Sequence, residues 1–348
     1  MNASGEVVLR IIGPPFSGSV QQTGAIPKSA VLLEIASDGS VFAYSGKVEY
    51  GQGIRNSFTR MIASTLEIEV ADVHVILADT ARVPYDRGTT GSASTRTVGA
   101  QLFRAANAAK NELAERKDSD GSGADTDVVE IEISGDEPSP EEFTRLTPHM
   151  GAVRIDGADR VTGKAVFAYD FALDGTAYGS LIRPPSIGAK LVRIDSARAA
   201  QVPGFIQLVQ ANGIIGVVGE TKEAADRAVS FVRTRWDETG DDVSDWSLPS
   251  ALKDLGSDPV SLRDDGDVSA GLSSGARLIS GVYYAPYVAN AQMEPSAATA
   301  EWGEDRSLTV WCANRGPFTE RAYLAEHLGI DAEKIRVIIE EVGGSFGT

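Results

Sequence analysis

Three glycine-rich segments contain the residues of this chain whose types and spacing are best suited to chemistry. They are Gly51-Gln52-Gly53, Gly88–Ser94 and Gly343–Gly347. Glycine has no Cβ, so it lets the backbone approach a ligand closely, and it tolerates φ > 0. The first two segments run into predicted helices, whose starts offer unpaired N–H groups and a positive dipole end. These two segments therefore predict a site for an anion such as a phosphate group.

Side chains within the segments could bind the same ligand. The amide of Gln52 can both donate and accept a hydrogen bond. The run Gly91-Ser92-Ala93-Ser94 combines a flexible backbone with small hydroxyl donors, as a pyrophosphate or pterin cradle requires. The alternatives are an exposed glutamine at a helix cap and a plain turn with an N-cap serine.

The elements that must position these segments are predicted from the spacing of apolar residues. The predicted strands are residues 31–36, 41–48, 73–77, 128–133, 164–169, 177–183, 189–194, 205–211, 214–219, 277–284, 307–313 and 334–341. The predicted helices begin near Ile54, Val98, Lys222 and Phe318. Asp38-Gly39 is a strong hairpin signal between the first two strands, and Thr221 is the predicted N-cap of the third helix.

One stretch is repeated within the chain. Leu66–Leu77 matches Leu328–Ile339 in apolar spacing, and both copies follow a predicted helix and lead from a strand into a loop. The copies are too far apart for a solenoid. Two related lobes flanking an inserted domain fit better, and lobes that face each other would form a cleft for a ligand. A chance match between two helix–turn–strand units is the alternative.

Composition excludes several classes of protein. The 348 residues suffice for two or three domains, and a net charge of −17 disfavours binding to nucleic acid. A single cysteine excludes an internal disulfide and an iron–sulfur cluster held by this chain alone, and three scattered histidines argue against structural zinc. No apolar run approaches the ~20 residues of a membrane span. Without a secretory signal at the first residues, we expect a cytoplasmic protein.

Taken together, the glycine-rich segments and their neighbours resemble the molybdopterin-binding large subunit of the xanthine dehydrogenase family of molybdenum hydroxylases. The resemblance covers nearly the whole chain. The stretches that carry it are, in order, Gly46–Arg55, Pro84–Arg96, Val161–Pro184, Met293-Glu294-Pro295 and Val342–Gly347. The Gly-Gln-Gly stretch precedes the one similar to an α/β hammerhead domain. This order resembles the bacterial subfamily of isoquinoline 1-oxidoreductase and nicotinate dehydrogenase-like enzymes.

The resemblance implies an α+β fold in which two related molybdopterin-binding lobes, the second incomplete, flank an α/β hammerhead domain. Residues 1–147 would form the first lobe and residues 153–238 the hammerhead domain. Residues 239–275, rich in Asp, Ser and Gly, would be a linker. Residues 276–348 would begin the second lobe.

The implied cofactor is molybdenum–molybdopterin, and its cytosine dinucleotide form is common in bacterial members. The resemblance implies no FAD, no iron–sulfur cluster and no protein ligand to a metal in this chain. The implied cofactor-binding residues are Gly51, Gln52, Gly53, Gly91, Ser92, Ala93, Ser94, Arg315, Gly344, Ser345, Phe346 and Gly347.

Two of these residues depart from the family's pattern. Arg315 lies where the family usually has the glutamine of a Thr-Gln pair, and a guanidinium donates but cannot accept. It argues against an ordinary active site or indicates an anionic substrate or cofactor group nearby, and the alternative is a surface arginine. Ser345 replaces the third glycine of the family's last loop and would be strained at φ > 0.

Other reactive residue types are interpreted as structural. Glu49 and Glu294, next to glycine or proline, should form ion pairs or caps within the lobes. Neither Glu340 nor Glu341 is predicted to be catalytic, and Cys312, in an apolar strand, should be a buried small hydrophobe.

The resemblance implies oxidative hydroxylation of an N-heteroaromatic or an aldehyde with water as the oxygen source. The family's general base is a glutamate near the end of the full-length subunit, so no catalytic residue is assigned here. The expected partners are a second molybdopterin-binding chain or missing C-terminal part, an iron–sulfur subunit and an optional FAD subunit. The rival hypotheses are a non-catalytic or assembly fragment and a phosphate-binding protein unrelated to molybdenum.

Overall fold

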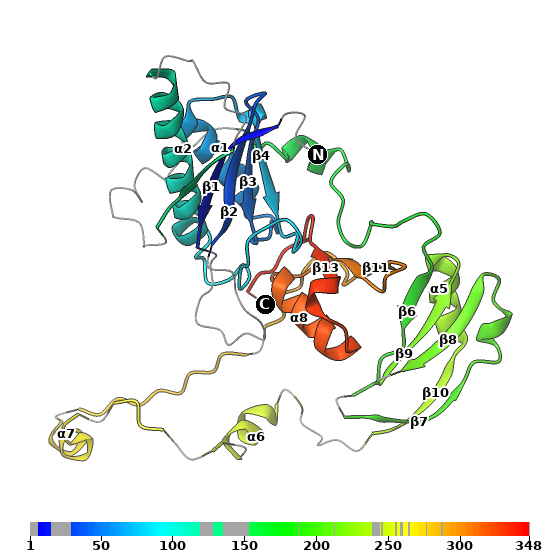
Figure 1. Cartoon of the computed structure of the whole chain (residues 1–348). Coiled ribbons are helices and arrows are strands. Elements are labelled where there is room, and N and C mark those ends of the chain that lie inside the picture. Colours follow the sequence, from blue (N-terminus) through cyan, green and yellow to red (C-terminus); the bar gives the residue numbers. More distant parts are fainter. Residues whose placement is uncertain are drawn as a thin grey trace. The chain divides into compact units, whose positions relative to one another are not determined.

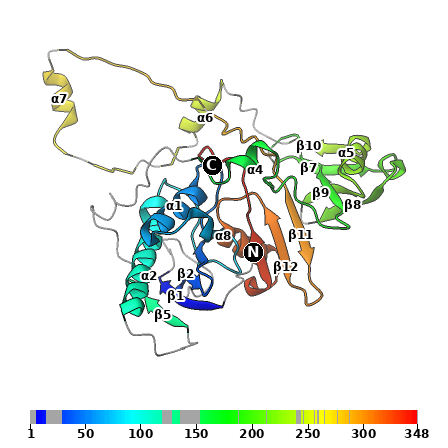
Figure 2. The same cartoon turned by 90° about the horizontal axis from the view of Figure 1, so that it is seen from above.

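The computed structural model describes residues 6–14, 29–118, 128–134 and 153–347, apart from positions 187, 212, 239–243, 245, 255, 258–259, 264, 276 and 287. The chain divides into two compact units. The first comprises Met1–Ala172 with Val288–Thr348, and the second comprises Leu173–Tyr287. Figures 1 and 2 show the elements from two directions.

A five-stranded sheet forms the centre of the first unit. Its order is β4-β3-β2-β1-β5, with β3 and β4 parallel and β2 and β3 antiparallel. The strands are β1 (Val7–Gly13), β2 (Ala30–Ala36), β3 (Val41–Ser45), β4 (Val73–Leu77) and β5 (Val129–Glu132). The predicted hairpin turn is confirmed, because Gly39 takes φ 86° and its amide donates to the carbonyl of Ala36 over 3.0 Å.

Two helices cover one face of this sheet, α1 (Ile54–Leu66) and α2 (Ala100–Asp118) (Figure 1). The apolar spacing that predicted α1 places Ile54, Phe58 and Ile62 in the core, all at most 3% exposed. A single π-helical turn, Thr95–Gly99, precedes α2. Both helices thus pack on the same sheet. The first glycine-rich loop, before α1, and the second, before α2, therefore both lead into helices of one layer.

The second half of the repeat is a smaller sheet in the same unit, with order β11-β12-β13. Its elements are β11 (Ala298–Trp302), β12 (Leu308–Cys312), α8 (Pro317–Leu328) and β13 (Ile335–Ile338). As in β2-β3-α1-β4, the first strand pair is antiparallel and the pair that spans the helix is parallel. Both helices end on a left-handed residue, Glu67 at φ 60° and Gly329 at φ 64°, before a 3₁₀ turn. The repeat is therefore a real structural repeat, and it is longer than the matched sequence.

The two copies of the repeat join where β4 and β13 end. The amide of Ile339 donates to the carbonyl of Ala78, and the amide of Thr80 donates to that of Val337, each over 3.0 Å. Asp79 binds the guanidinium of Arg336 through both carboxylate oxygens, at 2.9 and 2.6 Å. The loops that follow β4 and β13 therefore start from one junction.

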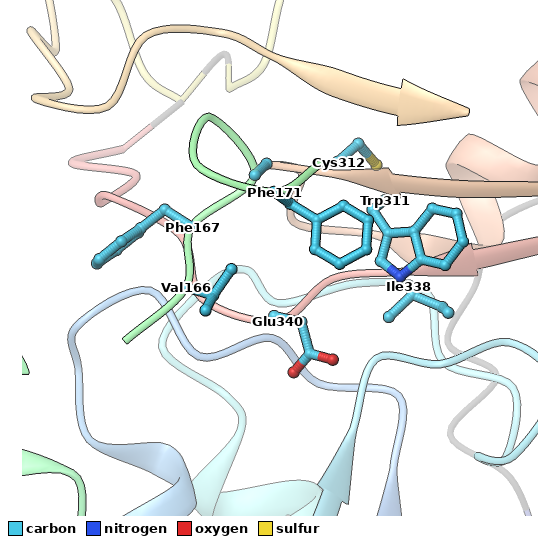
Figure 3. A pocket seen from close by; sticks show the side chains of 8 residues that line it. Val166, Phe167, Phe171, Trp311, Cys312, Ile338 and Glu340 are labelled. Atoms are coloured by element: carbon cyan, nitrogen blue, oxygen red, sulfur yellow. The ribbon is translucent and has the colours of Figure 1, made fainter. Parts of the chain in front are cut away.

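A segment before the second unit crosses the smaller sheet. It contains the short helix α4 (Gly157–Val161), and Phe171 stacks on Trp311 with ring centroids 4.8 Å apart (Figure 3). The cavity between the segment and the sheet is only about 10 Å³. The predicted strand at 164–169 is wrong, because this stretch forms turns and a single bridge, Phe167 to Glu341, instead of a ladder.

The second unit contains a three-stranded sheet, β6-β9-β8, and a two-stranded ribbon, β7-β10. The strands are β6 (Tyr178–Leu181), β7 (Lys190–Asp195), β8 (Phe205–Ala211), β9 (Ile214–Gly219) and β10 (Arg233–Asp237). Helix α5 (Lys222–Phe231) packs on β9, and the Thr221 hydroxyl caps it by accepting from the Ala224 amide over 3.1 Å, as predicted.

Two further expectations fall in the second unit. The predicted linker contains two short helices among its described residues, α6 (Leu248–Asp254) and α7 (Val268–Ser274). The predicted strand at 277–284 is wrong, since no strand is formed there and Ile279 and Val282 are exposed. A β-prone sequence needs a partner strand to become a strand. None of the described helices is both long and apolar enough to cross a bilayer.

Candidate functional site

The loop between β3 and α1 is organised around the fully buried side chain of Glu49. Its Oε1 accepts from the amides of Gly51 and Gly53 at 2.9 and 3.0 Å, and its Oε2 accepts from the Arg55 amide at 3.0 Å. Gly51 and Gly53 have φ of 98° and 81°, which turns their amides inward. The predicted role of Glu49 as a cap is confirmed. The amides of Gly51 and Gly53 are consequently not available to an outside anion, contrary to the expectation for this helix start.

The side chain of Gln52 also supports its own loop. Its Oε1 accepts from the Tyr50 amide, and its Nε2 donates to the Val48 carbonyl, both at 2.8 Å. Each end of a carboxamide has capacity for a second hydrogen bond. The side chain is therefore held in one orientation while it can still contact a ligand.

A buried ion pair attaches the second glycine-rich loop to the first. The Nζ of Lys47 lies 2.8 Å from Asp86 Oδ1 and donates to the Gly88 carbonyl at 2.8 Å, and both side chains are at most 2% exposed. Burial lowers the pKa of Lys47 and raises the pKa of Asp86, and the partner's charge opposes each shift. The Val48 amide donates to Thr89 Oγ1 over 2.7 Å, which adds a second link.

Sequence reasoning missed this pair. Lys47 and Asp86 both stand inside the stretches that carry the family resemblance, but nothing in their spacing showed that they meet. The available signal was a lysine directly after an apolar strand and before a glycine loop, a place where an ammonium group needs a partner when it is buried.

One cavity of about 350 Å³ lies between the first two loops. It is lined entirely by neutral side chains, most of which carry a hydroxyl or an amide. The lining residues are Tyr50, Gln52, Ile54, Ser57, Thr89, Thr90, Ser92, Ser94 and Thr95. The structure thus brings together the predicted residues Gln52, Ser92 and Ser94.

Backbone groups at this cavity are open to a ligand. Within the described chain, the amides of Gly91, Ser92 and Ser94 donate to no protein acceptor. A Cβ added at Gly51 or Gly91 would meet no atom of the described residues within 4 Å, so these residues leave the space beside both positions free. Neutral donors, free amides and open backbone fit a large anionic ligand. The free amides belong to the second loop rather than to the first.

The third glycine-rich loop lies beside Glu49 but does not line that cavity. The Val342 amide donates to the Glu49 carbonyl over 3.2 Å, and the Gly343 amide donates to Glu294 Oε2 over 2.7 Å. Glu294 thus has a structural role, as predicted, although it holds a loop amide and caps no described helix. A Cβ at Gly343 would come within 2.3 Å of Glu294 Cβ, which requires glycine there.

The remaining residues of the third loop are held by polar side chains. Asn290 donates to the Phe346 carbonyl over 2.7 Å, and Gln292 donates to the Ser345 carbonyl over 3.1 Å. Phe346, not Ser345, has positive φ, at 51°. Serine in place of the family's third glycine is therefore accommodated without the strain considered from the sequence. Gly344 and Gly347 also take positive φ.

Arg315 lies at the start of α8, next to the second loop. Its carbonyl accepts from the Thr89 amide over 2.8 Å, and Asn314 Oδ1 accepts from the amides of Arg315 and Gly316. The side chain is exposed, and its charge lowers the pKa of Tyr50 while burial, the larger effect, raises it. Arg315 thus stands close to a residue that lines the cavity.

The other reactive residue types behave as structural groups. Glu340 is exposed, whereas Glu341 forms ion pairs with Arg160 and Arg55. Cys312 is buried in the core, and burial raises the pKa of its thiol to about 12. Among the described residues, no group of three or more His, Cys, Asp or Glu could hold a metal ion.

Comparison with known proteins finds one matching family model over each copy of the repeat. Two family models, both described as "Molybdopterin cofactor-binding domain", match residues 8–174 and 255–348. A nicotinate dehydrogenase subunit of Pseudomonas putida is 28% identical over 96% of this chain and 31% of its own length. The aldehyde oxidoreductase molybdenum-binding subunit PaoC of Escherichia coli is 27% identical over 56% of this chain and 30% of its own.

Among solved structures, quinoline 2-oxidoreductase from Pseudomonas putida 86 matches 56% of this chain and 30% of its own, with 22% identity and a TM-score of 0.47. The chain spans about a third of the length of the nicotinate dehydrogenase subunit and of PaoC.

Proposed function

Because this chain belongs to the molybdopterin-binding subunits of the xanthine dehydrogenase family, we propose that the cavity of its first lobe holds part of a molybdenum–pterin cofactor. The single observation that carries the proposal is the meeting of the first two glycine-rich loops around one neutral, donor-lined cavity. A pterin with its phosphate groups is large, anionic and rich in hydrogen-bonding edges, which suits such a lining. When bound, the cofactor would supply the redox chemistry at molybdenum.

Two groups of residues would hold it in different ways. Ser92, Ser94 and the free amides of the second loop would bind its anionic part, and Gln52 would bind a polar edge. Gly51 and Gly91 leave the space open, Gly53 completes the first loop beside the guanidinium of Arg154, and Ala93 sits between the two serines. We extend the proposal to Arg315 and to the loop Gly344-Ser345-Phe346-Gly347, which would approach the cofactor in the complete site.

The proposed activity is oxidative hydroxylation of an N-heteroaromatic or an aldehyde, with water as the oxygen source. Relatives named for nicotinate and for aldehyde oxidation support these two substrate classes. The whole enzyme would also contain the remainder of the second lobe, an iron–sulfur subunit and an optional FAD subunit, and it would work in the cytoplasm. We propose the cytosine dinucleotide form of the cofactor. Residues 153–238 would be its hammerhead domain, 239–275 a linker, and 276–348 the beginning of the second lobe after a first lobe at 1–147.

A pair of variants at Ser92 tests the binding site. Ser92 has φ 51°, a conformation that both Asp and Asn tolerate better than most residues. In the assembled enzyme purified from its host, Ser92→Asp would place a negative charge in the cavity and should reduce bound molybdenum and pterin by roughly tenfold or more, a loss of about 1.4 kcal/mol in affinity. Ser92→Asn, of equal shape but neutral, should retain far more cofactor. Equal contents in the two variants would contradict the proposal.

One observation favours the rival, a non-catalytic or assembly subunit. Arg315 stands at the start of α8, where the family usually has a glutamine, and it brings a fixed charge close to the site. The rival predicts that the assembled enzyme binds the cofactor without turning over any heteroaromatic or aldehyde substrate with a dye acceptor. Turnover that is lost with Gln52→Ala would reject it.

A further inference from the structure

A cluster of six charged side chains connects the first and third glycine-rich loops. It consists of three acids and three arginines, Glu49, Asp156, Glu341, Arg55, Arg154 and Arg160, and we call it the Glu49 cluster. Its members come from the β3–α1 loop and helix α1, from the segment at α4, and from the loop between β13 and Gly343. All six lie in the first compact unit. The charges of the cluster sum to zero.

Arg160 is the member that bridges the two loops. Its Nη2 binds Glu341 Oε2 in a short ion pair and lies 3.7 Å from Glu49 Oε1. Glu49 is fully buried, and the side chain of Glu341 is 13% exposed. One guanidinium thus lies within ion-pair distance of two carboxylates that belong to different loops.

The other members hold Arg160 in place and complete the charge balance. Asp156 Oδ2 accepts from Arg160 Nε at 3.0 Å and from Arg154 Nη2 at 2.6 Å. Arg154 Nη2 lies 3.6 Å from Glu49 Oε1, and Arg55 Nε lies 4.0 Å from Glu341 Oε1. Asp156 therefore fixes two arginines, which together face the buried carboxylate of Glu49.

Loss of Arg160 would leave two carboxylates close together with too little positive charge. Burial already raises the pKa of Glu341, the charge of Glu49 adds to the rise, and Arg160 is the strongest group that opposes it. Glu49 cannot move away without releasing three backbone amides. The loop after β13 that carries Glu341 would have to shift instead, and Val342 and Gly343 follow Glu341 directly along the chain.

We propose that Arg160 is a positioning residue of the cofactor site, which ties the third glycine-rich loop to the first. This inference rests on the proposed function. Arg160 touches no reacting group itself. It acts through Glu49 and Glu341, whose neighbours Gly51–Gly53 and Gly343–Gly347 are the proposed cofactor loops.

The test measures the rate at which the assembled enzyme loses molybdenum and pterin during dialysis, together with its melting temperature. Arg160→Met removes the guanidinium and should speed the loss by roughly tenfold or more, since it leaves the partly buried Glu341 and the fully buried Glu49 without a shared counter-charge. The double variant Arg160→Met/Glu341→Gln removes the surplus charge and should restore a rate near that of the unchanged enzyme. Arg160→Lys keeps the charge but has no fork to bridge two carboxylates, so an intermediate rate is expected.

Arg10→Met is the matched control, because Arg10 pairs with Glu34 and Glu130 on the large sheet of the same unit. It should lower stability at most and leave the rate of cofactor loss unchanged.

Four outcomes separate the possibilities. Faster loss in Arg160→Met with recovery in the double variant supports the inference. A lower melting temperature with an unchanged rate would show a merely structural role and overturn it. If Arg160→Met does not fold, a double variant that folds but still loses cofactor at a tenfold higher rate would overturn it as well. An unchanged enzyme without molybdenum or pterin would reject the proposed function, and this inference with it.

Discussion

The two copies of the ββαβ repeat share a fold but differ in the loop that enters the helix. Both have the same strand order, the same parallel pairing across the helix and the same left-handed helix end. In the first copy, residues 46–53 lead into α1 around a buried glutamate, whereas residues 313–316 lead into α8 around Asn314. The apolar pattern determines the framework, and the loops determine what each copy can bind.

The loops of the two copies also exchange contacts in a reciprocal way. The loop after β4 donates from Thr89 to Arg315 in the second copy, and the loop after β13 donates from Val342 to Glu49 in the first. Each helix-entry loop thus receives one hydrogen bond from the other copy. Of the two cavities described for this unit, the larger one, of about 350 Å³, lies where the longer entry loop of the first copy meets the loop at Thr89–Thr95.

The largest expected effect comes from breaking the helix-entry cap of the first copy. Glu49→Ala would leave three amides and two arginines without their buried acceptor, so we expect unfolding free energy to fall by about 3–5 kcal/mol. The matching change, Asn314→Ala, removes a neutral acceptor of two amides and should cost only about 1 kcal/mol. Urea unfolding of both variants would measure the difference, and equal losses would show that the two caps are equivalent after all.

A smaller effect is expected where the second glycine loop meets the other copy. Gly88 has φ 115°, and a Cβ there would lie 3.1 Å from the Arg315 carbonyl oxygen and 3.3 Å from Gly316 Cα. Gly88→Ala combines backbone strain with crowding and should cost about 2–3 kcal/mol.

Gly39→Ala provides the control for that variant, because Gly39 has φ 86° and nothing within 4 Å of an added Cβ. It should cost only about 1 kcal/mol. The difference in melting temperature between the two variants measures the crowding of Gly88 against Arg315 and Gly316. Equal melting temperatures would indicate that the two copies are not closely packed at Gly88.

The smallest effect tests the helix ends, where the copies use different residues in the same conformation. Glu67 takes φ 60° and Gly329 takes φ 64°. Glu67→Gly should therefore stabilise the protein by about 0.5–1 kcal/mol, less a small loss of its exposed pair with Lys110, and Gly329→Glu should destabilise it by about 1 kcal/mol. Chemical denaturation measures the change in unfolding free energy of each variant. Changes of opposite sign would confirm that the two helix ends are equivalent, and changes of the same sign would contradict it.

Much of this framework could be predicted from the sequence. Helix α1 and strand β4 follow directly from apolar spacing, and the matched pattern of Leu66–Leu77 and Leu328–Ile339 predicted the repeat. The failures are at 164–169, where a single bridge forms instead of a ladder, and at 277–284, which pairs with no strand among the described residues. Pairing is a property of the whole fold, so a local pattern cannot decide it.

The candidate site was predicted in part. The sequence identified the loops that line the cavity, because glycine and small hydroxyl residues are visible as types. The sequence could not show that the carboxylate of Glu49 accepts hydrogen bonds from the amides at the start of α1. Nor could it show the ion pairs of Lys47 with Asp86 and of Arg160 with Glu341. These pairs are far apart in the chain, and only the folded structure brings them together.

Hydrogen exchange of the assembled enzyme, with and without its cofactor, measures directly whether the cavity of the first lobe holds the cofactor. We expect cofactor binding to protect the amides of Gly91, Ser92 and Ser94, which have no protein acceptor in the described chain. The amides of Gly51 and Gly53, already bound to Glu49, should exchange at nearly the same rate in both states. Unchanged exchange at Gly91, Ser92 and Ser94 would contradict the claim that this cavity holds the cofactor.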